Sequence, residues 1–230
     1  MKDRTKIIIG VLLVQSAGGS LYIWSTFVRP LISAHGYTAD ETLAVYAIAI
    51  LFFSFGLIVS ATMLKAKGPR FTTTVGALSF GIGVILAGFT SSVPTLALTY
   101  GVLGGIGVGT MYLCPLVVMG TWMPEKPGVA NGICIMGFAL STLIFVPIAN
   151  AVLGTGPATV STIRTTFLIM GSIYLVTSLV GARILRFPPN FAPKKQPDTD
   201  ADVSTKEAIK TKQFWLVFAT VIFGCIPGAF

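Results

Sequence analysis

A stripe of polar residues runs through the first apolar segment of the chain. Its members follow one another at steps of three, four, three and four residues, which places them on one face of an α-helix. They are Gln15, Gly18, Tyr22, Ser25 and Arg29. Apart from Gly18, these residues have side chains that can form hydrogen bonds with a solute or with a neighbouring helix. A lipid-facing stripe would be costly, so the pattern predicts either the lining of a water-filled cavity or a packing face that hydrogen-bonds to a neighbouring helix.

Arg29 ends this stripe and allows two interpretations. Its guanidinium can reach back to lipid headgroups along its flexible stem. Alternatively, it can attract an anionic solute into an outer vestibule. The spacing alone leaves both open.

Acidic residues are missing from most of the chain. No Asp or Glu occurs between Glu41 and Glu125, or between Glu125 and Asp198. Proton relays and sodium sites inside membranes generally use buried carboxylates, so these segments predict no conventional cation-coupling device. The sequence also contains no phosphate-binding loop, Ser–His pair or His/Cys cluster of the usual spacing. We therefore expect no enzymatic activity, no cofactor and no metal site.

A glycine seam marks a second segment of interest. Gly101, Gly105 and Gly109 recur at every fourth position. They share one helical face and allow a neighbouring helix to approach closely. Tyr112, three residues further on, continues roughly the same face.

The elements that carry these residues are predicted to be membrane-spanning helices. The chain is 53% hydrophobic but only 10% charged, whereas ordinary soluble domains are about 25% charged. A helix needs about 20 apolar residues to cross a bilayer. Suitable runs occupy residues 7–32, 42–64, 71–90, 95–119, 129–152 and 165–186, and a last run begins at residue 213. The fold class is therefore an all-α membrane protein.

Basic residues set the expected orientation. Of the 16 lysines and arginines, 14 fall on one side of this arrangement, and only Arg29 and Arg164 fall on the other. Because positive charge stays in the cytoplasm, we expect a multi-pass protein of the plasma membrane with a cytoplasmic N-terminus.

The net charge of +8 could suggest a nucleic-acid partner. Confinement of the charge to short segments between apolar runs favours the lipid bilayer instead.

The composition changes after the sixth run. Residues 187–212 are polar and rich in proline and mixed charge, which predicts a flexible cytoplasmic linker. The run at residues 213–230 is marginal in length for one crossing. We expect three parts: a six-helix bundle (residues 1–186), the linker (residues 187–212) and a truncated seventh helix (residues 213–230).

Four stretches in this order resemble the major facilitator superfamily, and more closely the oxalate:formate antiporter family, which is related to monocarboxylate transporters. They extend over nearly the whole chain. They are Tyr22–Leu31, Gly68–Arg70, Gly101–Tyr112 with the Trp-Met-Pro-Glu-Lys segment at residues 122–126, and Lys210–Trp215.

This resemblance implies twelve helices in two bundles, each built from 3+3 inverted repeats, with alternating access to a midplane site. The chain would hold the N-terminal bundle and the start of the seventh helix. Tyr22 and Tyr112 match positions where family members place aromatics against a small carboxylate, and Gln15 lies below Tyr22. The cytoplasmic gate would include Lys65, where an acidic residue is usual, together with Gly68, Pro69 and Arg70. The family's charge-neutralising Arg and Lys would belong to a missing C-terminal bundle.

The leading hypothesis is a secondary active transporter of small organic anions, such as oxalate, formate or a monocarboxylate. One alternative is a truncated membrane protein or solute sensor that does not transport. Another is a half-transporter that works as a homodimer, with a second copy in place of the C-terminal bundle.

Overall fold

The computed structural model describes residues 2–189, 191, 210–213 and 215–216. The chain divides into two compact units, residues 1–189 and residues 190–230. The predicted linker (residues 187–212) and truncated seventh helix (residues 213–230) lie mostly outside the described residues. These two segments, and the boundary at residue 186, therefore stay predictions.

Helices form every regular element among the described residues of the first unit. The first span is α1 (Lys2–Gly19), continued by the 3₁₀ segment η1 (Ser20–Trp24) and by α2 (Ser25–His35). The long helix α3 covers Ala39–Ala87. The next span joins α4 (Val93–Leu96), the π-helical segment η2 (Ala97–Gly104) and α5 (Gly105–Trp122). The last two helices are α6 (Pro127–Leu153) and α7 (Val160–Ile184).

Helix α3 contains two of the six predicted spans. A straight helix of its 49 residues would extend roughly 73 Å, more than twice the hydrocarbon thickness of about 30 Å. The backbone leaves helical geometry at Gly68, where φ is 78° and ψ is 175°, and Pro69 starts the second arm. Glycine suits this turn because other residues rarely adopt a positive φ. In the part of the chain that the structure describes, five long apolar helices therefore provide six crossings.

The two arms of α3 (residues 39–67 and 69–87) run in opposite directions along α5. In the first arm, Ala49 and then Phe53 meet Gly105 and then Gly109, so this arm is parallel to α5. In the second arm, Gly76 lies against Met111 and Gly83 against Gly104, so this arm is antiparallel to α5. The chain therefore reverses at Gly68, as the Gly-Pro pair predicts.

Close packing along the glycine seam is confirmed. A Cβ atom on Gly56 would lie 2.9 Å from the Cα atom of Gly109 and 2.5 Å from the Ile106 carbonyl oxygen. On Gly105 or Gly109, a Cβ would collide with the carbonyl oxygen of Ala49 or Phe53. Helix α5 thus touches the first arm of α3 backbone to backbone.

The pairing of helices follows the pattern of an inverted repeat. The first span packs on α6, the first arm of α3 on α5, and the second arm on α7. In span numbers, these pairs are one with five, two with four, and three with six. Exchanging span one with four, two with five and three with six turns the first pair into the second and leaves the third unchanged. This is the arrangement expected of 3+3 repeats.

Several helix ends differ from the apolar runs that predicted them. The sixth span was expected at residue 165, but α7 begins at Val160, because the Thr159 hydroxyl accepts a hydrogen bond of 3.2 Å from the Thr162 N–H. Thr38 and Glu41 form a capping box that starts α3 at Ala39. Polar caps extend a helix beyond its apolar part because they satisfy its first N–H groups.

Candidate functional site

Four aromatic rings, one from each of four spans, meet at one face of the bundle, and we call them the aromatic cluster. The ring of Phe138 stands edge-on to both Tyr22 and Tyr112, with centroid distances of 5.5 Å and 5.1 Å. Phe53 contacts the other side of Tyr112 at 5.6 Å. Edge-to-face contacts of this kind fix ring orientation.

The cluster includes two residues that sequence reasoning missed, Phe53 and Phe138. Nothing in the spacing around Phe138 predicts its position, because that depends on which face of α6 meets the first span.

The polar stripe divides into a covered part and an open part. Tyr22 is 57% exposed, and Ser25 and Arg29 are exposed above it. Gln15 is only 1% exposed and lies against Gly137 of α6. Its amide Nε2 has no hydrogen-bond partner among the described residues. The structure therefore brings Tyr22 and Tyr112 together around Phe138 and places Gln15 behind them in helix packing.

Both spans that carry the tyrosines depart from regular α-helix. Tyr22 lies in η1, and η2 precedes α5 in the span of Tyr112. Interruptions of this type inside helices are frequent at functional sites. Trp24 of η1 packs on Tyr100 of η2 with ring centroids 4.4 Å apart, so the two irregular segments are in contact. The Trp24 indole N–H also donates to the Thr42 carbonyl at 2.9 Å.

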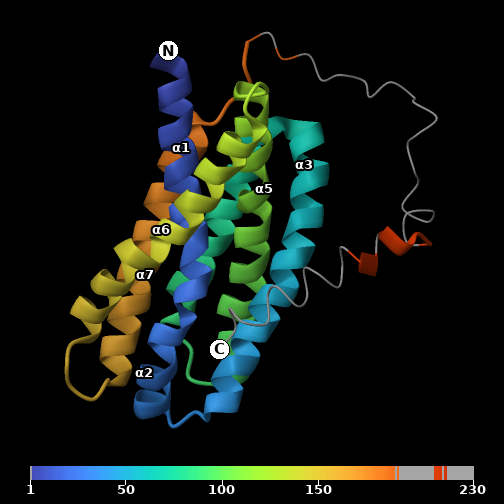
Figure 1. Ribbon diagram of the computed structural model, residues 1–230. Coiled ribbons are helices and arrows are strands. Elements are labelled where there is room, and N and C mark those ends of the chain that lie inside the picture. Colours follow the sequence, from blue (N-terminus) through green and yellow to red (C-terminus); the bar gives the residue numbers. More distant parts are fainter. Residues whose placement is uncertain (1, 190, 192–209, 214, 217–230) are drawn as a thin grey trace. The chain divides into compact units, whose positions relative to one another are not determined.

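Arg29 belongs to α2, which lies toward the end of the bundle opposite the N-terminus (Figure 1). It lines an open cavity of about 300 Å³ between α2 and the end of α6. Thr26, Ser33 and Asn150 contribute polar groups to the same wall. This position is compatible with the predicted outer vestibule.

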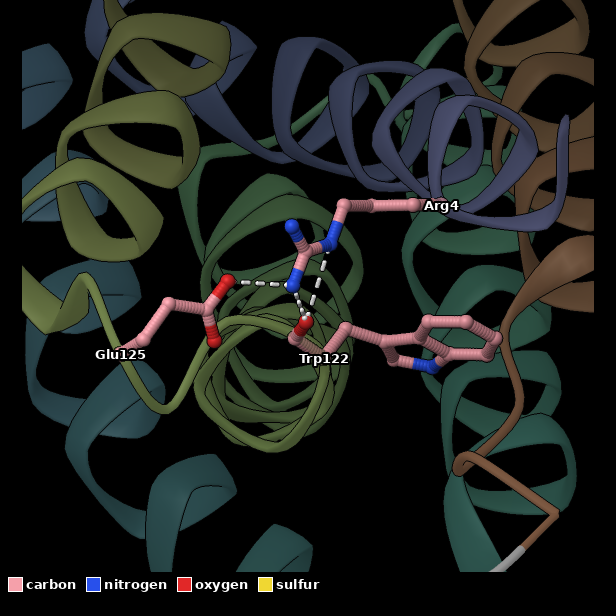
Figure 2. Close-up of polar contacts among 3 residues, drawn as sticks. All are labelled: Arg4, Trp122 and Glu125. Atoms are coloured by element: carbon pink, nitrogen blue, oxygen red, sulfur yellow. Dashed lines mark hydrogen bonds and ion pairs between the residues drawn. The ribbon is translucent and has the colours of Figure 1, made fainter. Parts of the chain in front are cut away.

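At the N-terminal end, polar contacts join the first, fourth and sixth spans. We call Asp3, Arg4, Trp122, Glu125 and Arg186 the terminal clamp. Figure 2 shows Arg4 reaching both the Glu125 carboxylate, at 2.5 Å, and the Trp122 carbonyl oxygen, at 3.1 Å from Nε. The Trp122 indole N–H donates to the Arg186 carbonyl at 2.7 Å, and Arg186 pairs with Asp3 at 2.9 Å.

Glu125 is exposed in the turn between α5 and α6. A backbone hydrogen bond and the Arg4 guanidinium lower the pKa of its carboxyl group. Both favour the ionised form because they donate to the carboxylate.

The four predicted gate residues lie at this same end of the bundle. Lys65 is exposed, Gly68 makes the turn and Pro69 is buried. Arg70 donates from Nε to the Leu185 carbonyl oxygen at 3.2 Å, which ties the second arm of α3 to the end of α7. Among the described residues, no three His, Cys, Asp or Glu side chains come together as a metal site would require.

Comparison with known proteins agrees with this architecture. The family model of the Major Facilitator Superfamily matches residues 6–230. An oxalate:formate antiporter of Oxalobacter formigenes is 29% identical over 95% of this chain and 52% of its own length. The uncharacterized transporter YhjX of Escherichia coli is 27% identical over the whole chain and 56% of its own length. Monocarboxylate transporter 2 of Homo sapiens is 29% identical over 67% of this chain and 32% of its own length.

The chain thus spans about half the length of the first two relatives. It is an integral, multi-pass membrane protein with transporter relatives. The family model covers nearly all of its residues, and the helix pairing is that of one transporter half. The chain belongs to the major facilitator superfamily.

Proposed function

We propose that this chain forms the N-terminal half of a secondary active carrier of small organic anions, with carboxylates as the substrate class. One observation carries the proposal: Phe138 orients two phenols, Tyr22 and Tyr112, at one face to which four spans contribute. The relatives that are oxalate:formate and monocarboxylate transporters support the same class of solute.

The chemistry of this face suits a carboxylate. Each phenol hydroxyl can donate a hydrogen bond to a carboxylate oxygen, while its ring narrows the space available to larger solutes. None of the six predicted apolar runs contains an Asp or Glu that would repel an anion. Hydrogen bonds from the two phenols stabilise a bound carboxylate but do not balance its charge once it has left water. The cation that does so belongs, on this proposal, to a C-terminal bundle facing the cluster.

Gln15 and Arg29 have supporting roles in this proposal. Arg29 attracts the anion into the cavity of about 300 Å³ at the outer end. Gln15 offers an amide donor two helical turns before Tyr22 on the same face. Its Nε2 has no hydrogen-bond partner among the described residues, which favours a solute or water as the acceptor in another access state.

The remaining parts of the proposal concern orientation and gating. Arg70 of the basic turn lines the same cavity as Asp3 and Lys6 near the N-terminus. Basic residues gathered at one end of the bundle support a cytoplasmic N-terminus, and we place the protein in the plasma membrane. The turn and the terminal clamp then form the cytoplasmic side of the gate. Their contacts would hold this half together as one body while it rocks against its partner.

Transport by the complete protein in liposomes tests this function. Liposomes preloaded with oxalate, formate or lactate should accumulate the labelled carboxylate from outside, and a neutral sugar or an amine should not enter. Saturable binding without accumulation would instead favour a solute sensor. A crosslinked dimer of this chain that transports without any further bundle would favour the homodimeric half-transporter.

A further inference from the structure

Two adjoining cavities at the N-terminal end of the bundle are lined mainly by cationic side chains. We call them together the basic pocket. One, of about 350 Å³, lies at the α3 turn and the end of α7, and the other, of about 210 Å³, adds the start of α1. Each is several times the volume of a water molecule, about 30 Å³. Their charged residues are Asp3, Lys6, Lys67, Arg70, Arg183 and Arg186.

Carboxylates of the described residues balance only part of the charge of this pocket. Arg186 is paired with Asp3 at 2.9 Å. The other four cations have no carboxylate partner among the described residues, and Arg70 uses its Nε to bind the Leu185 carbonyl oxygen. Like charges held this close repel one another, so an anion in the pocket is favoured.

The surroundings of the pocket are typical of the membrane interface. Lys67 lies over the ring of Phe71 at 4.5 Å, and Phe71 is 42% exposed. Trp122 places its indole N–H beside the same end of α7, through the Arg186 carbonyl. Aromatic rings and the stems of basic side chains are typical of the headgroup level.

The two helices that border the pocket expose apolar side chains farther along their length. The second arm of α3 exposes Leu78 and Ile82, and α7 exposes Val176 and Val180. These two helices pack against each other. A ligand whose anionic head occupies the pocket can therefore lay hydrocarbon chains along the adjoining helix surface.

We propose that the basic pocket binds the phosphate of an anionic phospholipid of the leaflet at the N-terminal end. Lys6, Lys67, Arg70 and Arg183 supply the charge, and the acyl chains lie on the exposed faces of α3 and α7. The lipid bridges α1, the α3 turn and α7 from outside, next to the terminal clamp. Basic pockets between membrane helices are suited to such headgroups. A soluble anion would match the charge but not the apolar surface.

Lipid binding to the purified protein tests the assignment. Short-chain phosphatidylglycerol, short-chain phosphatidylcholine and inorganic phosphate are titrated separately. The melting temperature of the protein is recorded at each step, and bound lipid is detected by mass spectrometry. The test variant combines Lys6→Gln with Arg183→Gln, since neither side chain has a hydrogen bond or ion pair within the described bundle. The matched control is Lys126→Gln, which removes an exposed cation at the same end outside the pocket.

We expect phosphatidylglycerol to stabilise the wild type and the Lys126→Gln control equally. It should bind the double variant at least about tenfold more weakly, because two charge-assisted contacts to the phosphate are lost. Equal affinity of the double variant, or equal binding of phosphatidylcholine, would overturn the proposal. Inorganic phosphate that binds as tightly as the lipid would assign the pocket to a soluble anion.

A second measurement covers the case in which the double variant does not fold. A photoreactive phosphatidylglycerol is crosslinked to the wild-type protein in membranes, and the labelled peptides are identified. Labelling should concentrate in the peptides around residues 67–82 and 176–187. Labelling spread evenly over the exposed helices would contradict a specific site.

Discussion

The ring of Tyr112 meets the ring of Phe138 edge-on, with centroids 5.1 Å apart and planes at 80°. Tyr22 meets the same phenylalanine at 5.5 Å and 81°. One side chain of α6 therefore sets the orientation of two phenols that come from spans far apart in sequence. On our proposal, these two ring contacts orient the phenol hydroxyls so that both can donate hydrogen bonds to a carboxylate.

Substituting Phe138 tests that positioning role. Phe138→Leu keeps an apolar side chain but removes both edge-to-face contacts, each worth about 0.5–1.5 kcal/mol. The tyrosines then lose their fixed orientation, and the half-saturation concentration for carboxylate uptake should rise about fivefold. Phe55→Leu, on an exposed ring that contacts Phe52, is the matched control. Equal uptake kinetics in the two variants would remove Phe138 from the site.

The glycine seam predicts a sharp difference between two glycines of α5. A Cβ at Gly109 collides with the Phe53 carbonyl oxygen, so Gly109→Ala should force α5 and α3 apart and lower the free energy of unfolding by about 1–3 kcal/mol. Gly120→Ala meets nothing within 4 Å and should be neutral or slightly stabilising. Melting in detergent measures both. A stable Gly109→Ala protein would contradict the backbone contact.

Acid should weaken the terminal clamp through Glu125. The folded state lowers the pKa of this carboxyl below its ordinary value of 4.5. Its contribution to stability is therefore complete above the ordinary value and is lost as the pH falls through the lowered one. The melting temperature of the wild type should drop between about pH 6 and about pH 3. Glu125→Gln should drop less over the same range, and identical pH profiles would exclude the Arg4–Glu125 pair as a source of stability.

The sequence predicts the six spans and their side-by-side packing well, for a physical reason. Apolar runs report directly which segments lipid can solvate, and Gly105 and Gly109 report where a helix can approach. Helix ends are less predictable, because caps such as Thr159 lie outside the apolar run.

The candidate site is harder to read from sequence. A stripe such as Gln15 to Arg29 specifies a helical face but not its neighbours. Helix α6 covers Gln15 and leaves Tyr22 exposed, and that division follows only from the crossing of α1 with α6. Phe138 was missed for the same reason. Long-range contacts between helices, such as Arg4 with Glu125, are likewise absent from any local pattern.

Carboxylate uptake by Tyr22→Phe and Tyr112→Phe tests the central claim most directly. Each change removes one hydroxyl and keeps the ring against Phe138. The matched control is Tyr37→Phe, in the loop between α2 and α3, which removes a hydroxyl that has no hydrogen-bond partner among the described residues. A hydrogen bond to a charged group contributes about 1.5–3 kcal/mol, so each site variant should raise the half-saturation concentration about ten- to a hundredfold. Half-saturation concentrations equal to that of Tyr37→Phe in both site variants would contradict the account.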